Sequence, residues 1–329
     1  MTLDPQGTLP VTLEITLAPP DLRHAVHILP HQLGVWGRQV REILCVIDLR
    51  PVPGRPDRLW EQRGRELLDV VDTCCSRFSH ARRATVDYGS RTSSAVSSMF
   101  FRGRPVPAKT ARGGPFYAYF FGLHKAQFDY ILHLDSDMLF GGGSQTWVRE
   151  AVCLLRERRD VLVTQPLPGP PTADGGVKAE GAKPERYAYP AFRFETFTTR
   201  YFLLDRNRFL DRIGGLEVRQ HAPLRRRVGL AEWLRGLPNL SFRDRLRPLT
   251  LSTPPYELPE RLLGEAMNRA GLYRIDFLGN EPGMWSLHPR ERPERYYEAL
   301  PALIQRIESG DISDRQRGHY DLDESMLAP

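Results

Sequence analysis

Apolar residues recur along the first 140 positions with two different spacings, and these spacings alternate. Alternating or nearly continuous apolar stretches predict strands at 11–17, 42–48, 84–89 and 130–134. Apolar residues three and four positions apart predict helices between these strands, most clearly from 55 to 78. The stretch after residue 89 is rich in Ser, Pro and Gly and is expected to be a loop before the next helix. Repeated alternation of strand and helix predicts an α/β fold with a mostly parallel sheet flanked by helices.

The pattern becomes less regular after residue 140. Helical spacing returns near 147–158 and 293–310, while 166–186 is rich in proline and glycine and is expected to be a loop. We expect a single domain with a regular half (1–140), an irregular half (141–310) and a polar tail (311–329) that is mobile.

Aspartates follow several of the predicted strands. Asp48, Asp87, Asp135 and Asp137 each stand at, or just after, the last residues of a strand. In parallel α/β sheets, the ligand crevice lies outside the carboxyl ends of the strands. The aspartates are therefore expected to face one shared cleft.

The segment FDYILHLDSDMLFGGG (128–143) places two of these carboxylates one residue apart, directly after a buried strand. Mg²⁺ and Mn²⁺ prefer oxygen ligands, and protein sites often supply only one or two carboxylates beside substrate phosphates. The glycines that follow would let the backbone approach a bulky ligand. The alternative interpretation is a pair of solvated aspartates in a turn.

Composition narrows the setting of this chemistry. No apolar run approaches the roughly 20 residues of a membrane-spanning helix, and no secretory leader is evident. Four cysteines without disulfide or zinc spacing favour a reduced, cytoplasmic location.

The net charge is +6, and eight arginines fall within 219–247 with few aromatic residues among them. This favours an acidic small molecule or an anionic lipid surface over nucleic acid.

Beyond these patterns, the segment GGPFYAYFFGLHKAQFDYILHLDSDMLF resembles the helix–strand–DXD core of family-2-like GT-A glycosyltransferases. Weaker similarities are RYFLLDRNRFLDRIGGL (200–216), YELPERLLGEAMNRAGLYRIDFLG (256–279) and GMWSLHP (283–289). The resemblance implies a GT-A (Rossmann-like) fold, with a nucleotide-sugar-binding half at 1–140 and an acceptor-side half at 141–310. It implies transfer of a sugar from a nucleoside diphosphate sugar, with a UDP-sugar favoured, to an acceptor hydroxyl.

The resemblance also implies a metal site and a donor site. Asp137 would bind Mn²⁺ or Mg²⁺ directly, Asp135 would bind the ribose or the metal through water, and His288 would complete the metal ligands. The remaining donor-binding residues would be Asp48 and Asp87 at the nucleotide, Pro19 at the rim of the base pocket, Lys109 and Arg112 near the phosphates, and Ser136 between the two aspartates.

The catalytic base is less clearly marked. Inverting members of this class carry a Glu-Asp pair at the start of the acceptor-side helix, and this chain has Glu257-Leu258-Pro259-Glu260 there. Glu257 or Glu260 is expected to deprotonate the acceptor. Both inverting and retaining stereochemistry stay open.

Two other functions fit parts of the sequence. The segment LDSDML also matches the motif of haloacid-dehalogenase-like phosphatases, although that motif normally opens its domain and here more than 130 residues precede it. The third possibility is a non-catalytic nucleotide-binding protein. The acceptor and the oligomeric state are left open by the sequence.

Overall fold

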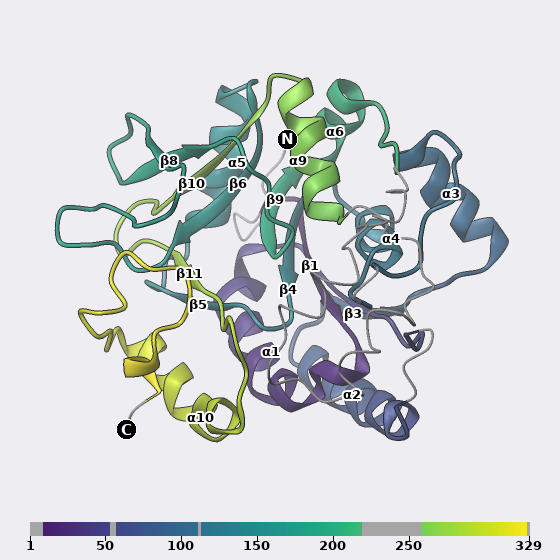
Figure 1. The fold of residues 1–329 in the computed structure, drawn as a ribbon, viewed down its shortest axis with the longest axis horizontal. Coiled ribbons are helices and arrows are strands. Elements are labelled where there is room, and N and C mark those ends of the chain that lie inside the picture. Colours follow the sequence, from purple (N-terminus) through teal and green to yellow (C-terminus); the bar gives the residue numbers. More distant parts are fainter. Residues whose placement is uncertain (1–8, 53–56, 111–112, 219–257, 328–329) are drawn as a thin grey trace, which may run out of the picture.

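A computed structural model describes residues 9–52, 57–110, 113–218 and 258–327. The expected α/β class is confirmed: a central sheet is flanked by helices (Figure 1). The strands are β1 (Val11–Leu17), β2 (Glu42–Ile47), β3 (Ala81–Thr85), β4 (Tyr130–Asp135), β5 (Leu139–Gly141), β6 (Val161–Pro168), β7 (Lys183–Pro184), β8 (Ala191–Phe194), β9 (Tyr201–Asp205), β10 (Tyr273–Phe277) and β11 (Trp285–Leu287). The α-helices are α1 (Leu22–Trp36), α2 (Trp60–Cys75), α3 (Ser90–Phe101), α4 (Tyr117–Lys125), α5 (Trp147–Glu157), α6 (Arg206–Ile213), α9 (Pro259–Arg269) and α10 (Glu294–Ser309).

The order of strands across the sheet determines where a ligand can bind. The main path runs β3-β2-β1-β4-β9-β6-β10-β8-β7, and the first four strands are parallel. The chain moves from β1 outward to β2 and β3, and then returns to the other side of β1 as β4. Because the direction of strand order reverses between β1 and β4, a crevice is expected at the carboxyl ends of these two strands.

The second half departs from the parallel pattern. Strand β9 is antiparallel to both β4 and β6, whereas β6 and β10 are parallel. Two further short strands, β5 and β11, pair with each other, and β11 continues onto β6. The irregular half predicted from the sequence is therefore a mixed extension of the same sheet.

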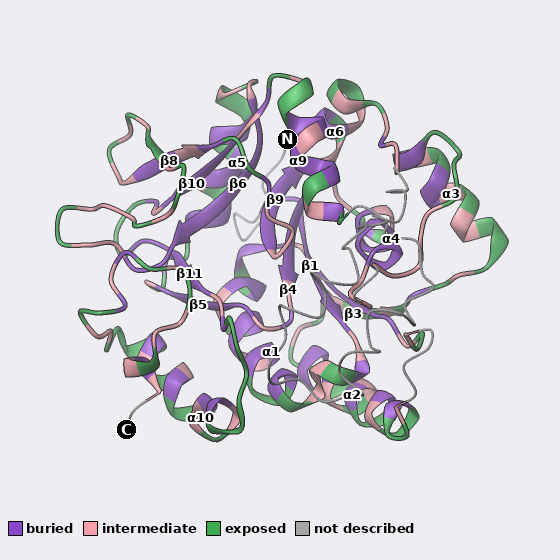
Figure 2. Ribbon diagram, in the orientation of Figure 1, coloured by how far each residue is buried: buried purple, intermediate pink, exposed green. Residues whose placement is uncertain are grey.

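Burial follows the layers of the fold. The central strands are buried along their length, and the helices bury the side that faces the sheet while their other side is exposed (Figure 2). Strand β1 shows this most clearly, because all seven of its residues are buried although apolar and polar residues alternate along it.

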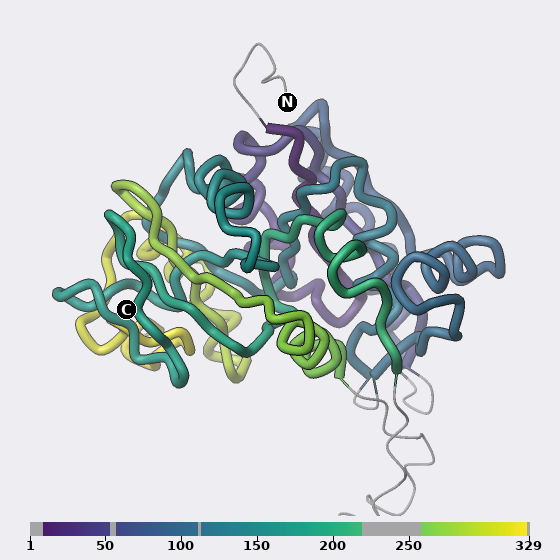
Figure 3. The backbone as a smooth tube through the Cα atoms, turned by 90° about the horizontal axis from the view of Figure 1, so that it is seen from above, coloured from purple at the N-terminus to yellow at the C-terminus, as the bar shows by residue number. Residues whose placement is uncertain are grey.

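Two segments differ from the sequence interpretation. Residues 90–101, interpreted as part of a loop because of their serines, form α3. Residues 311–327 follow α10 and pack against the protein, although their composition suggested a mobile tail. Gln316 is fully buried, and the Tyr320 ring stacks on His288 and packs at a tilt against Tyr201. In the view from above, this yellow C-terminal segment lies on the opposite side of the molecule from α3 (Figure 3).

Candidate functional site

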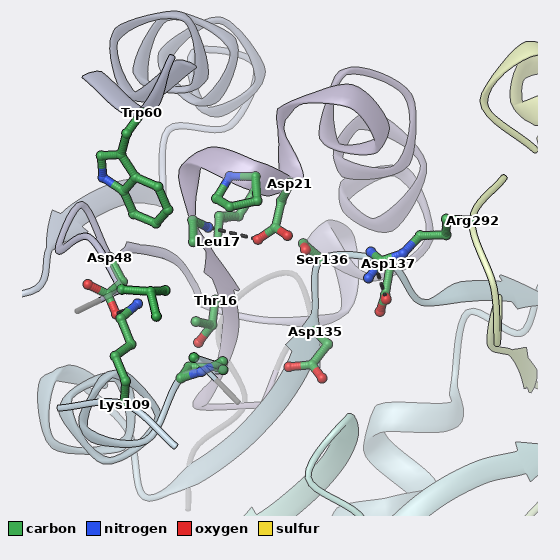
Figure 4. A pocket seen from close by; sticks show the side chains of 16 residues that line it. Thr16, Leu17, Asp21, Asp48, Trp60, Lys109, Asp135, Ser136, Asp137 and Arg292 are labelled. Carbon is green, nitrogen blue, oxygen red and sulfur yellow. Dashed lines mark hydrogen bonds and ion pairs between the residues drawn. The ribbon is translucent and has the colours of Figure 1, made fainter. Parts of the chain in front are cut away.

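A pocket of about 540 Å³ lies at the carboxyl ends of β1, β2 and β4, where the order of strands reverses (Figure 4). Of the aspartates predicted to share a cleft, Asp48, Asp135 and Asp137 line this pocket. The other lining residues are Thr16, Leu17, Ala18, Pro20, Asp21, Val52, Trp60, Lys109, Gly113, Gly114, Pro115, Ser136 and Arg292.

Asp135 ends β4 and is held by side chains beneath the pocket. The Tyr119 hydroxyl donates a hydrogen bond of 2.7 Å to Asp135 Oδ1, and His133 Nε2 lies 3.5 Å from the same oxygen. His133 is fully buried and also pairs with the fully buried Glu14. Burial alone would lower the pKa of His133, but the Glu14 charge and the Asp135 contact outweigh it and raise the pKa to about 9. Asp135 therefore lies beside a protonated His133, and Glu14 balances the charge of this imidazole.

Asp137 occupies a more acidic environment. Burial, and then repulsion from Asp135, raise the pKa of Asp137 to about 7. Asp137 Oδ2 lies 3.1 Å from a guanidinium nitrogen of Arg292. Burial also raises the pKa of Asp21 to about 6, and the Asp135 charge contributes to this rise. Three carboxylates thus gather at this end of the pocket, and among the described residues Arg292 is the guanidinium that lines it.

Ser136 connects this end of the pocket to α1. Its hydroxyl lies 3.0 Å from His24 Nε2, and both side chains are buried. Burial, and then the Arg292 charge, lower the pKa of His24 to about 3, so its imidazole is neutral. The serine between the two aspartates is therefore held by a neutral partner.

The opposite end of the pocket contains one neutralised carboxylate. Lys109 Nζ lies 2.7 Å from Asp48 Oδ2, and the Tyr88 hydroxyl lies 3.0 Å from each carboxylate oxygen. The sequence assigned Asp48 to the nucleotide and Lys109 to the phosphates, which would separate them. In the structure they form one buried ion pair in the pocket wall.

Several predicted site residues lie away from this pocket. Pro19 is buried near Gly64 of α2, and its neighbour Pro20 lines the pocket instead. Asp87 accepts hydrogen bonds from Gly89 N and from the Thr92 hydroxyl, at the start of α3.

His288 does not line the pocket either. Its Nδ1 lies 3.6 Å from Asp321 Oδ1, and its ring stacks on Tyr320 with the centroids 5.7 Å apart. Burial, and then the Arg200 charge, lower its pKa to about 4, so the imidazole is in the neutral form that a metal would require.

Glu260, one of the two candidate bases, stands in the first turn of α9. It lines a smaller pocket of about 220 Å³, which shares Gly114, Pro115 and Asp135 with the large pocket. The Glu260 carboxylate therefore borders a space that adjoins the acidic end of the large pocket, the end lined by Asp21, Asp135 and Asp137. Glu257, Arg112 and the arginine-rich segment 219–247 lie outside the described residues.

Three residues of the large pocket were missed by sequence reasoning. Asp21, Trp60 and Arg292 were not singled out as site residues. Trp60 begins α2, and its indole N–H donates to Leu49 O at 2.8 Å, which fixes the ring against the pocket. Only Asp21 has a signal in the sequence. It belongs to the turn Pro19-Pro20-Asp21, which directly follows β1, the strand next to β4.

The pocket residues provide a partial ligand set for a divalent cation. Within the described ranges, no group of three His, Cys, Asp or Glu side chains is placed to hold a metal ion. Asp135 and Asp137 nevertheless supply the one or two carboxylates that Mg²⁺ or Mn²⁺ requires when phosphates provide further ligands. Because the pKa of Asp137 is raised partly by its acidic neighbour, an added cation would relieve a repulsion that the protein contains.

No protein-family model and no curated protein matches the sequence. Solved structures with some similarity include the first 349 residues of TarS from S. aureus in complex with UDP-GlcNAc, with 11% identity, 93% of this chain and 69% of that chain covered, and a TM-score of 0.44. Glucosyl-3-phosphoglycerate synthase from Mycobacterium tuberculosis with Mn²⁺, UDP and phosphoglyceric acid has 11% identity, with 90% and 76% covered and a TM-score of 0.34. The galactosyltransferase LgtC with donor and acceptor sugar analogs has 11% identity, with 90% and 96% covered and a TM-score of 0.35. Similarities at this level carry no information about donor, metal or acceptor.

No helix of the described chain combines the length and the apolarity needed to span a membrane.

Proposed function

We propose that this protein is a glycosyltransferase that depends on a divalent cation. It would transfer a sugar from a nucleoside diphosphate sugar, with a UDP-sugar favoured, to an acceptor hydroxyl. The observation that carries the proposal is the acidic end of the large pocket. Asp135 and Asp137 stand at the carboxyl end of β4, next to Asp21, and Arg292 supplies the guanidinium that lines this end.

A cation-bound diphosphate accounts for this arrangement better than a neutral ligand does. The Asp137 carboxylate, whose pKa is raised by burial and then by the neighbouring Asp135, is stabilised by a cation and destabilised by an anion. A diphosphate alone would therefore be repelled, whereas a diphosphate with Mn²⁺ or Mg²⁺ would be attracted. We assign Asp135 and Asp137 as the residues that hold the cation, which would neutralise charge on the departing diphosphate.

The pocket is also large enough for the donor. Its volume of about 540 Å³ lies in the usual range for small-molecule sites, roughly 300–1,000 Å³. Trp60 offers an aromatic ring at the end opposite Asp137, and we assign it to stack on the nucleotide base. The Asp48–Lys109 pair forms the wall beside it and offers polar edges for orientation.

The acceptor would enter through the smaller pocket. Glu260 borders that space together with Thr110, Tyr119 and Thr199, and Asp135 belongs to both pockets. A hydroxyl bound there would lie beside the donor, so Glu260 could take its proton if the transfer is inverting. Glu260 is our candidate base among the described residues, and His288 is our candidate for an additional metal ligand.

Calorimetry tests this function directly. The protein is titrated with UDP, GDP and dTDP, with and without Mn²⁺. The expected result is tight binding of one nucleotide only when the metal is present, followed by slow hydrolysis of the matching nucleotide sugar. Phosphate release from an aryl phosphate would favour the phosphatase instead. Nucleotide binding without transfer or hydrolysis of any sugar donor would favour a non-catalytic protein.

A further inference from the structure

Two cationic side chains line the described part of the large pocket, and they differ in how firmly they are held. Lys109 is 6% exposed and is paired with Asp48, which also accepts hydrogen bonds from Tyr88. Arg292 is 37% exposed and pairs with a single oxygen of Asp137 at 3.1 Å. A partly solvated ion pair of this kind is weak, so its partners can be exchanged at little cost.

The backbone around Arg292 is anchored, whereas its side chain can reorient. Arg292 lies between β11 and α10, with the buried Pro289 before it and Pro293 at the N-cap of α10. The adjoining helix α10 is held by its buried side chains, which belong to one core cluster with Ile28 of α1. The guanidinium can therefore change its partner by side-chain rotation alone, while the backbone of Arg292 stays in place beside the acidic end of the pocket.

A buried phenol close to this ion pair has no partner of its own. The Tyr296 hydroxyl is buried and makes no hydrogen bond with any residue that the structure describes. Burial, and then the Asp137 charge, raise the pKa of this phenol. Buried hydroxyls usually form hydrogen bonds. The unpaired hydroxyl therefore shows that not every polar group beside the ion pair between Arg292 and Asp137 has a hydrogen-bond partner. Among the described residues, the surroundings of Asp137 thus include a buried polar group that could still accept a hydrogen-bond partner.

We infer that Arg292 is an exchangeable counter-ion. It neutralises Asp137 while the pocket lacks a cation, and it turns to the diphosphate of the donor when a divalent cation binds at Asp135 and Asp137. This inference rests on the proposed function. Its physical basis is that the planar guanidinium fits carboxylate and phosphate oxygens equally well. A divalent cation at Asp137 would repel it from its present partner.

The exchange has consequences of opposite sign for two ligands. Arg292 competes with a metal ion that binds alone, because the ion must displace the guanidinium from Asp137. Arg292 assists a nucleoside diphosphate that binds with the metal, because the displaced guanidinium then meets the phosphates. A purely structural role would shift both affinities in the same direction or neither.

The test compares wild type with Arg292→Met, which keeps a side chain similar to the aliphatic stem of arginine and removes the guanidinium charge. Binding of Mn²⁺ alone is measured by electron paramagnetic resonance. Binding of UDP, GDP or dTDP, whichever wild type binds most tightly, is measured by calorimetry in saturating Mn²⁺. Arg290→Met, at an exposed arginine of the same segment, is the matched control. Circular dichroism and thermal unfolding check that each variant is folded.

In Arg292→Met we expect Mn²⁺ alone to bind about two- to fivefold more tightly, the gain expected when a partly exposed ion pair need not be broken. The nucleotide is expected to bind about tenfold more weakly, or worse, as when a hydrogen bond to a charged group is lost. Arg292→Lys should bind Mn²⁺ as wild type does and should recover part of the nucleotide affinity.

The inference is overturned if either shift is absent, or if Arg290→Met shows the same shifts. Failure of the proposed function looks different: wild type itself then binds none of the three nucleotides in the presence of Mn²⁺.

Discussion

The two ends of the large pocket differ in how the charges of their carboxylates are balanced. At one end, Asp48 meets one lysine and one tyrosine hydroxyl, so its charge is matched within the protein. At the other end, Asp21, Asp135 and Asp137 gather beside Arg292, the arginine that lines this end in the described part of the chain, and burial raises the pKa values of Asp21 and Asp137. The charge of Asp48 is balanced by the protein itself, whereas the three carboxylates at the other end would be stabilised by an added cation.

Exposure strengthens this contrast. The side chains of Asp48 and Lys109 are 1% and 6% exposed, and those of Asp137 and Arg292 are 13% and 37% exposed. A buried pair is strongly coupled because water cannot replace a missing partner, whereas a partly exposed pair can be opened by a ligand. We therefore expect substitutions at the Asp48 end to affect mainly stability and those at the Asp137 end to affect mainly binding.

The largest expected effect is at the neutralised end. Asp48→Asn leaves the Lys109 ammonium buried without its counter-charge, and this should lower the free energy of unfolding by about 3–5 kcal/mol. Urea unfolding measures the change. The double variant Asp48→Asn with Lys109→Met removes both charges and should recover most of the loss. Equal destabilisation of the single and double variants would show that the ion pair is not the cause.

Asp137→Ala should disable the acidic end with little loss of fold. It removes one of the two carboxylates assigned to the cation, so metal-dependent transfer should fall by about 100-fold or more, since loss of even an outer partner of a metal ligand costs about 10–100-fold. The rate of donor hydrolysis in Mn²⁺ is the measurement. Asp174→Ala, at an exposed carboxylate in the loop after β6, is the control. Full activity in Asp137→Ala would remove the metal assignment.

A smaller effect is expected at Trp60. If its ring stacks on the nucleotide base, Trp60→Ala should weaken nucleotide binding by about tenfold, within the roughly 1–3 kcal/mol typical of base stacking. Trp60→Phe keeps an aromatic face and should retain most of the affinity, although it loses the hydrogen bond to Leu49 O. Calorimetry with Mn²⁺ separates the variants, and equal affinity in Ala and Phe would exclude stacking.

The smallest expected effect concerns pH and stability. The pKa of Asp137 is raised from 3.8 to about 7, so between these values the folded protein retains a proton that the unfolded chain has released. Stability therefore falls as pH rises through this window, and the loss is complete above about pH 7. Asp137→Asn removes this loss and should raise the melting temperature by at least about 2 °C at pH 8, with a smaller gain at pH 5. A gain that is independent of pH would contradict the assignment.

The regular half of the fold follows closely from the sequence. The four strands, and the helices between them apart from α3, were predicted because buried parallel strands and amphipathic helices have distinct periods. Strand β1 was predicted from its alternation, and its polar residues Thr12, Glu14 and Thr16 are buried together with its apolar ones. The burial of Thr12 and Glu14 depends on partners from other strands, in the pairs Thr12–Glu42 and Glu14–His133, and these partners cannot be read from β1 itself.

Local pattern was also insufficient where tertiary packing overrides propensity. Serine competes with the backbone for hydrogen bonds and disfavours helices, so α3 was interpreted as part of a loop. In the structure, α3 is stabilised by packing of Val96, Phe100 and Phe101 in the core. The tail likewise has a polar composition, but Gln316 satisfies its amide with backbone groups of the same segment, and this allows it to be buried.

The sequence by itself determined the class of fold and the position of Asp48, Asp135 and Asp137 at one edge of the sheet. It could do so because strand endings are local and parallel strands carry their carboxyl ends to the same side. Only the tertiary structure decided which charges meet: Lys109 with Asp48, and Arg292 with Asp137. These contacts depend on the path of loops and on helices distant in sequence, and electrostatic pairing is determined by distance in space and by burial, neither of which is written in the local pattern.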